Sequence, residues 1–196
     1  MTRGAGFFRP YMAFSARRPT SRVDGDATAR FRQTMLPHMD AAYNFARYLA
    51  RDPVAAEDIV QEAFLSAFRS FGGWRGEGAK AWLLAIVKHV FLDWVRAHRE
   101  GTQTSESEDL TPDPDTPESL LLQANETAML RQTIAGLPEP FRETLVLREL
   151  EDLSYKENAV ITAVPIGTVM SRLARAREML SVLLLPDAEI QRKAQS

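Results

Sequence analysis

Residues 154–180, SYKENAVITAVPIGTVMSRLARAREML, decide the fold. Ser154 followed three residues later by Glu157 is a capping box, in which each side chain accepts a hydrogen bond from a free backbone N–H at the start of a helix. Pro165 suits the first position of a second helix, where its missing N–H costs nothing. The stretch therefore predicts two short helices joined by a tight turn near residues 162–164.

The second of these helices has two distinct faces. Its apolar residues recur at helical spacing: Val169, Leu173, Ala176 and Leu180. About 120° away, at ~100° per residue, lies a basic and hydroxyl-bearing stripe: Thr168, Ser171, Arg172 and Arg175. The pair resembles a helix-turn-helix, whose second helix enters the DNA major groove. An ordinary amphipathic surface helix is the alternative, since basic helices are common.

The composition is that of a soluble globular protein. The chain has 196 residues, 45% hydrophobic and 26% charged, which is room for one domain or two small ones. It has no cysteine, so disulfides and cysteine-ligated metal sites are excluded. The three histidines are widely separated, and no zinc signature occurs. No apolar run is long enough for a membrane span, and the first 25 residues lack the apolar core of a secretory signal. A cytoplasmic location is expected.

Charge is unevenly distributed along the chain. The net charge is −2, yet residues 100–126 hold eight acidic and no basic side chains, together with three prolines. Such a segment resists packing and predicts a flexible acidic linker. The arginine-containing residues 1–25 are expected to be a flexible basic tail. Because the acid is concentrated in one segment, the flanking parts can still present basic faces.

The first half of the chain predicts three helices. Residues 26–51 are helical, and Pro37 must either kink this segment or start its main helix. Asp52-Pro53 caps a helix that runs to about residue 71. One face of that helix is expected to be buried: Ile59, Val60, Ala63, Phe64, Ala67, Phe68 and Phe71. The other face combines an exposed leucine with polar side chains, which suits protein docking or a plain solvated surface: Asp58, Gln61, Glu62, Leu65 and Arg69.

The third predicted helix, residues 79–99, follows a glycine-rich loop. The loop lacks the Gly-Lys-Ser/Thr ending of a phosphate-binding loop. Trp74 in this loop could stack on a base or hold the loop against the helices. The predicted core arc of the helix is apolar, and a second arc is basic and aromatic, which suits contact with nucleic acid. The first arc contains Leu83, Ile86, Val87, Val90 and Trp94, and the second Lys88, His89, Arg96 and Arg99.

The remaining sequence predicts further helices and no strands. Residues 118–136 and 140–150 are amphipathic, and the helix pair described first follows them. The predicted fold is all-α, with two small helical domains joined by a flexible acidic linker. The expected boundaries are a tail at 1–25, a first domain at 26–99, a linker at 100–117, a second domain at 118–183 and a tail at 184–196.

Four stretches in this order resemble bacterial RNA polymerase sigma factors of the extracytoplasmic-function (ECF) group. They are AEDIVQEAF at 56–64, AWLLAI at 81–86 with Asp93 and Arg96, Leu137-Pro138 with Arg142 and LVLRE at 145–149, and GTVMSRLARAR at 167–177. The resemblance covers roughly residues 27–99 and 118–181. It implies a sigma region 2 helical bundle followed by a sigma region 4 helix-turn-helix.

The resemblance also implies partners and site residues. Core RNA polymerase, through the clamp of β′ and the flap of β, would bind Asp58, Gln61, Glu62 and Leu65. The promoter −10 element would contact Trp74, Lys80, Lys88, His89, Arg96 and Arg99. The −35 element would contact Pro165, Gly167, Thr168, Ser171, Arg172 and Arg175. A stress or envelope response, an anti-sigma factor, no cofactor, no metal and no direct membrane insertion are expected, and the acidic linker would follow the RNA exit path.

Three positions depart from the family pattern. Asn158 stands where an apolar residue usually packs, Ala163 where the turn often has glycine, and His89 where asparagine is common. A left-handed conformation at Ala163 would cost about 1 kcal/mol. The departures therefore bear on the stability of the helix pair and on base preference at −10.

Other functions fit the sequence less well. A plain DNA-binding regulator would need no polymerase-docking helix. A sigma-mimicking protein that captures an anti-sigma factor usually carries an α/β receiver domain, and no such pattern occurs here. Asp58 and Glu62 lie one helical turn apart, but on a solvated face they do not make a catalytic acid and base. The chain is therefore not expected to be an enzyme.

Overall fold

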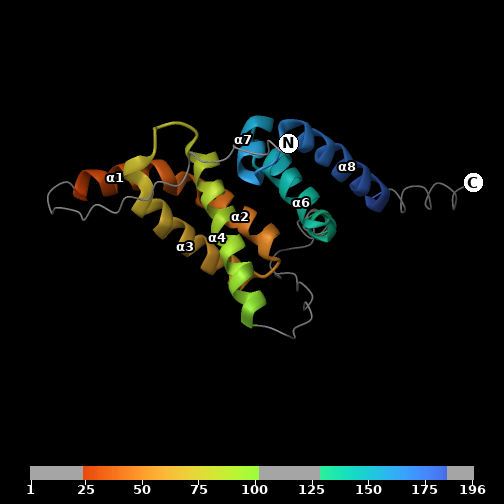
Figure 1. The fold of residues 1–196 in the computed structure, drawn as a ribbon, viewed down its shortest axis with the longest axis horizontal. Helices are drawn as coiled ribbons and strands as arrows, with labels where there is room; N and C mark the ends of the chain where they lie inside the picture. The colour runs from red at the N-terminus through yellow and green to blue at the C-terminus, as the bar shows by residue number, and fades with distance from the viewer. Residues whose placement is uncertain (1–23, 102–128, 185–196) are drawn as a thin grey trace, which may run out of the picture.

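The computed structural model describes residues 24–101 and 129–184, and these ranges contain helices and no strands (Figure 1). In the first range the elements are α1 (Asp24–Met35), the 3-10 turn η1 (Leu36–His38), α2 (Met39–Ala50), α3 (Pro53–Ser70), the 3-10 turn η2 (Phe71–Gly73) and α4 (Ala79–Gly101). In the second they are a helical segment at 129–136, α6 (Glu139–Leu145), the π-helical turn η3 (Val146–Leu150), α7 (Tyr155–Thr162) and α8 (Ile166–Leu184). The all-α prediction is confirmed.

Local signals in the sequence set the helix boundaries. Pro37 lies in the 3-10 turn that separates α1 from α2, which is the predicted kink. Asp52 is the N-cap of α3, where its Oδ1 accepts a hydrogen bond from the Ala55 N–H at 2.7 Å, and Pro53 follows at the first helical position. The predicted helix at 140–150 is α6 followed by the π turn η3. Several predicted segments lie outside the described residues. They are the linker from residue 102 onward, the start of the 118–136 helix, and both tails except for residues 24–25 and 184.

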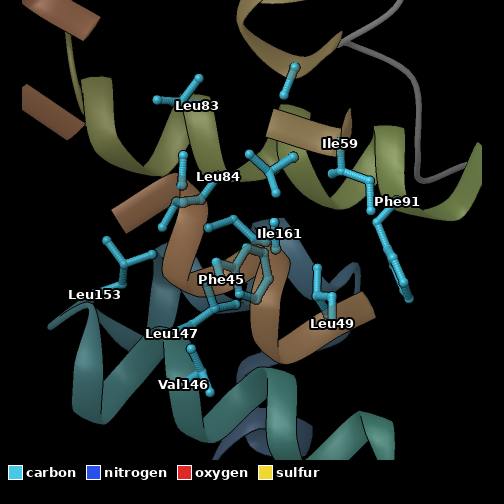
Figure 2. Close-up of a cluster of buried hydrophobic side chains, with 14 of the residues drawn as sticks. Phe45, Leu49, Ile59, Leu83, Leu84, Phe91, Val146, Leu147, Leu153 and Ile161 are labelled. Atoms are coloured by element: carbon cyan, nitrogen blue, oxygen red, sulfur yellow. The ribbon is translucent and has the colours of Figure 1, made fainter. Parts of the chain in front are cut away.

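The two domains pack against each other around α2 and α4. Figure 1 shows α1 and α3 on one side of α4 and the helices α6, α7 and α8 on the other. The buried apolar side chains of both domains form one continuous cluster. Within it, Phe45 and Leu49 of α2 lie near Val146 and Leu147 of η3 (Figure 2). The packed domains therefore share a core.

The buried faces differ from the predicted ones at three residues of α3 and α4. Leu84 and Phe91 lie outside the predicted core arc of α4, yet their exposed fractions are only 0% and 4%, and both belong to the shared cluster. Phe68 was predicted to be buried, but it is 47% exposed. Its ring meets the ring of Phe31 edge-on at 5.1 Å, so only part of it is covered.

Candidate nucleic-acid interface

The helix pair α7–α8 begins with the predicted capping box. The Ser154 Oγ accepts a hydrogen bond from the Glu157 N–H at 3.2 Å, and the Glu157 carboxylate accepts one from the Ser154 N–H at 2.8 Å. The connecting turn places Ala163 in the left-handed region, at φ 54°. Pro165 then starts the second helix, and its carbonyl accepts hydrogen bonds from the Thr168 and Val169 N–H groups. These contacts fix the angle at which α8 leaves α7.

The left-handed turn gives a first testable prediction. Ala163→Gly should stabilise the protein by about 1 kcal/mol, because the left-handed conformation costs an L-residue roughly that much and glycine almost nothing. Thermal unfolding should then shift upward by a few degrees. The matched control is Ala174→Gly on the exposed face of α8, which should destabilise the helix by about 1 kcal/mol. Equal shifts in the two variants would contradict strain at Ala163.

Asn158 connects α7 to the preceding helix. Its side chain is fully buried, and its Nδ2 donates a hydrogen bond to the Thr144 carbonyl at 2.8 Å. Thr144 lies just before the chain widens into the π turn η3, where the regular backbone hydrogen-bond ladder changes. A polar residue therefore serves at a position where an apolar one was expected, because it supplies a donor to a buried carbonyl.

Removing this donor gives a second prediction. Asn158→Ala should destabilise the protein by about 1–3 kcal/mol, since it deletes a buried hydrogen bond and leaves the Thr144 carbonyl without that donor. Chemical denaturation measures the loss. Val160→Ala, on the exposed side of the same helix, should change stability by less than about 0.5 kcal/mol. A loss at Asn158 as small as that of the control would show that the bond contributes little.

The buried face of α8 matches the predicted apolar stripe. Val169, Leu173 and Ala176 are at most 1% exposed, and Leu180 packs at the edge of the core. Of the predicted −35 residues, four are exposed and two partly buried. The exposed ones are Pro165, Gly167, Ser171 and Arg175, and the partly buried ones Thr168 and Arg172. The outer face of α8 thus brings most of these residues together.

Two apolar residues on this outer face were missed by sequence reasoning. Ile166 is 43% exposed and Met170 is 50% exposed. Met170 is three residues after Gly167 and four before Ala174. Helical spacing from these two exposed positions would therefore have predicted that Met170 lies on the same face. Apolar side chains at such places can contact the thymine methyl group in a major groove.

Arg172 is not free on this surface. Its Nη1 lies 3.3 Å from the Oε1 of Glu143 in α6, whose side chain is 7% exposed. Burial raises the pKa of Glu143, and the nearby Lys88 ammonium opposes that shift. On the other flank of α8, the Arg177 Nη2 lies 2.5 Å from the Glu149 Oε1. Arg175 is therefore the exposed basic residue of the predicted stripe, whereas Arg172 is held by a carboxylate of α6.

A buried arginine holds the turn before α6. The Arg142 Nη1 donates to the carbonyls of Leu137 at 2.6 Å and Ala135 at 3.2 Å. Burial lowers the pKa of Arg142 to about 10, so the guanidinium is still charged at neutral pH. The Leu137 carbonyl also accepts a bond from the Arg51 Nη2 of the first domain at 3.2 Å. Arg142 thus orients the segment that starts α6.

The predicted −10 residues fall into two groups on α4. Lys80 and Lys88 face the second domain: Lys80 is partly buried against Glu151, and Lys88 is only 8% exposed. His89 and Arg96 lie on the exposed face, and both contact Asp93, at 3.3 Å and 2.6 Å. The side chain of Arg99 lies outside the described residues. The structure therefore does not bring these residues onto one surface.

Trp74 packs against the helices. Its ring stacks on Phe71 with centroids 5.5 Å apart, and its Nε1 donates to the Glu77 carbonyl at 3.0 Å. Trp82 at the start of α4 lies 6.3 Å away. The indole thus ties the glycine-rich loop to the ends of α3 and α4, as the structural interpretation predicted.

The predicted docking face of α3 is on the surface. Asp58, Gln61 and Glu62 are exposed, and Leu65 among them is 50% exposed. Glu62 forms an exposed ion pair with Arg69 at 3.3 Å. Ile59 and Ala63 on the opposite side are buried, so the core fixes this face outward. The four residues form one continuous patch along the helix, because they lie at spacings of three and four.

Comparison with known proteins agrees with this geometry. The family described as Sigma-70 region 2 matches residues 35–100, and the family described as Sigma-70, region 4 matches residues 127–180. The RNA polymerase sigma-H factor of Pseudomonas aeruginosa is 36% identical over 69% of this chain and 76% of its own length. The ECF RNA polymerase sigma-E factor of Haemophilus influenzae is 36% identical over 71% of this chain and 79% of its own.

The chain belongs to the ECF sigma factors. It is a sigma factor of transcription initiation, with α2, α3 and α4 in region 2 and α6, α7 and α8 in region 4. The sigma factor RpoE, solved in complex with the anti-sigma factor NepR from Bartonella quintana, matches with a TM-score of 0.69 and 30% identity. That match covers 81% of this chain and 98% of the solved one. CnrH, solved with the cytosolic domain of CnrY, shows the same fold at a TM-score of 0.58.

Other kinds of site find no support in the described part of the sigma factor. Among residues 24–101 and 129–184, no group of histidine and carboxylate side chains is arranged to hold a metal ion. No helix in these ranges is long and apolar enough to cross a membrane.

Proposed function

We propose that this sigma factor recognises promoters by a two-point contact, with the outer face of α8 in the −35 major groove and the exposed face of α4 near the −10 element. The observation that carries this proposal is the outer face of α8. The side chains of Arg175 and Ser171 lie there beside the open backbone at Gly167, on a helix held on its other side by a fully buried stripe. Arginine and serine at such positions donate to base edges or phosphates.

The −10 contact is assigned to the predicted basic side chains of α4, some of which are exposed while others face region 4. His89 and Arg96 are exposed in the packed arrangement, whereas Lys80 and Lys88 face region 4. Arg99 follows Arg96 along the same helix. Trp74 acts on the loop by packing. Melting costs stacking energy, which cationic and aromatic contacts to the separated strand offset.

The contact with core RNA polymerase is assigned to the exposed patch on α3, which consists of Asp58, Gln61, Glu62 and Leu65. An exposed leucine surrounded by polar groups is a pattern in which one apolar anchor supplies binding energy and the rim supplies specificity. The clamp of β′ would take this patch, and the flap of β would take region 4. Tethering both DNA contacts through one polymerase raises their effective concentration and makes the pair selective.

An anti-sigma factor is the proposed regulator. The RpoE chain that matches 81% of this sequence was solved in complex with the anti-sigma factor NepR. We assign this chain to the cytoplasm, to a stress or envelope response, and to a role without catalysis of its own. A plain DNA-binding regulator is disfavoured because the exposed α3 patch serves no purpose in it.

Transcription with purified core polymerase tests this function. The chain should direct specific initiation from a subset of a promoter library, with a shared sequence about 35 and 10 base pairs upstream of the start. Core polymerase alone should give none of these products. Tight DNA binding by the free chain without specific initiation would favour the regulator instead.

A further inference from the structure

The exposed part of α8 carries two parallel rows of residues. Positions 166, 170 and 174 are four residues apart and follow one line along the helix, and the residues directly after them follow a second line about 100° away. The first row is apolar and consists of Ile166, Met170 and Ala174, and the second consists of Gly167, Ser171 and Arg175. Every member of both rows is exposed. The helix therefore presents an apolar row directly beside the row assigned to promoter DNA.

The apolar row starts where a recognition helix meets the bases. Ile166 is the first residue of α8, and the N-terminal residues of such a helix are the ones that contact base edges. From Ile166 to Ala174 the row is about 12 Å long at ~1.5 Å per residue, which matches the width of a major groove. A Cβ added at Gly167 would meet nothing within 4 Å. The surface beside the row is therefore open to the edges of DNA bases.

The two large side chains of this row do not serve the core. Met170 is 50% exposed and Ile166 is 43% exposed. Neither belongs to the buried apolar cluster or to the partly buried side chains that pack against it, whereas Val169 and Leu173 of the same helix do. The apolar surface of both side chains lies in water, and a partner that removes it from water gains free energy.

The shape of the row favours DNA over a protein as that partner. The row is one side chain wide and borders Ser171 and Arg175, whereas a protein-docking surface has a broader apolar centre with a polar rim. In the major groove, the C5-methyl of thymine is the apolar group on a base edge, and the other bases present hydrogen-bond donors and acceptors. An apolar side chain would leave those polar groups unpaired, which costs binding energy. The row therefore selects thymine.

We propose that Met170 is a specificity-determining residue whose side chain packs on the C5-methyl group of a thymine in the −35 element. Ile166 and Ala174 extend the same apolar contact on either side of it. A methionine side chain adapts well to such a surface, because it is unbranched and its sulfur is polarizable. Ser171 and Arg175 supply the polar contacts alongside. This inference rests on the proposed function, because it names a base that the outer face of α8 prefers.

Replacing thymine by deoxyuridine tests the methyl contact. Deoxyuridine lacks the C5-methyl group and keeps the hydrogen-bonding groups of thymine. The probe is a promoter that the complex of this chain with core polymerase selects from the library, with each thymine of its −35 element replaced in turn on either strand. One replacement should weaken binding about fourfold, which is the effect of one buried carbon at ~0.8 kcal/mol. An element without thymine, or one that tolerates every replacement, would overturn the proposal.

Three variants assign the methyl contact to one side chain. Met170→Ala should bind the thymine and deoxyuridine forms of the sensitive position within about 1.5-fold of each other, because the group that distinguishes them is gone. Met170→Leu stays apolar at similar volume and should retain at least about twofold discrimination. The matched control is Val182→Ala, which shortens an exposed apolar side chain about 18 Å further along α8. It should discriminate as well as the unchanged chain.

Each other outcome has a distinct meaning. Full discrimination that persists in Met170→Ala would overturn the proposal, even with weaker binding overall. A loss of affinity for core polymerase in Met170→Ala, with discrimination unchanged, would show that the row docks a protein instead. Specific initiation that ignores every deoxyuridine would remove this inference and leave the proposed function in place. Absence of specific initiation by the unchanged chain would remove the proposed function and this inference with it.

Discussion

Arg175→Ala should lower initiation from −35-dependent promoters by about 10- to 100-fold, because a well-placed arginine contact to a base is worth roughly 1–3 kcal/mol. Arg175 is exposed on the outer face of α8. Its side chain is therefore available to the groove without breaking a contact inside the protein. Multiple-round transcription with core polymerase and a purified promoter measures the loss.

The control for Arg175 lies two residues further along the same helix. Arg177→Ala removes the same charge, but Arg177 pairs with Glu149 on another flank of α8, so initiation should fall much less. Binding to core polymerase should be unchanged in both variants. Equal losses in the two would indicate general attraction to DNA charge and would contradict a specific contact by Arg175. Arg172 is a poorer test, because its removal also leaves Glu143 with one fewer cation.

Leu65→Asp should weaken binding to core polymerase by about 10- to 100-fold. Burying a leucine is worth roughly 1.5–3 kcal/mol, and every 1.4 kcal/mol is about tenfold in affinity. Leu65 is half exposed on α3, so the change should not disturb the core. Competition with a labelled sigma factor for core polymerase measures the loss.

Val54→Asp is the matched control for Leu65. Val54 is on the same helix and 68% exposed, and it lies one helical turn before Asp58 and about three turns from Leu65. Its replacement introduces the same charge and should leave the affinity for core within about twofold, since surface changes away from a contact have small effects. A similar loss at Val54 would place the polymerase contact elsewhere on α3.

Features set by neighbours in the sequence could be predicted from it. The capping box at Ser154 and Glu157, the cap at Asp52 and the kink at Pro37 each depend on residues within one helical turn, and all three occur in the structure. The buried stripe of α8 was also predicted, because it follows from helical period alone. Family resemblance supplied the identity of the two regions.

Features set by contacts between the domains could not be predicted in this way. Lys88 was interpreted as part of a basic arc, yet Glu139, 51 residues away in the chain, meets it in the fold. A one-helix pattern cannot reveal which of its faces a second domain covers. Asn158 shows a related limit, since the Nδ2 of this polar residue at a core position donates to a carbonyl whose position depends on a π turn, whereas its buried Oδ1 has no hydrogen-bond partner in the structure.

The single apolar cluster around Phe45 has a consequence for the lifetime of the protein in the cell. Phe45 and Leu49 are covered by Val146 and Leu147 when the domains are packed. Separation would uncover a patch that proteases and aggregating chains recognise, so an open factor is vulnerable unless another protein covers it. The abundance of this sigma factor should therefore depend on how quickly it passes from one binding partner to the next.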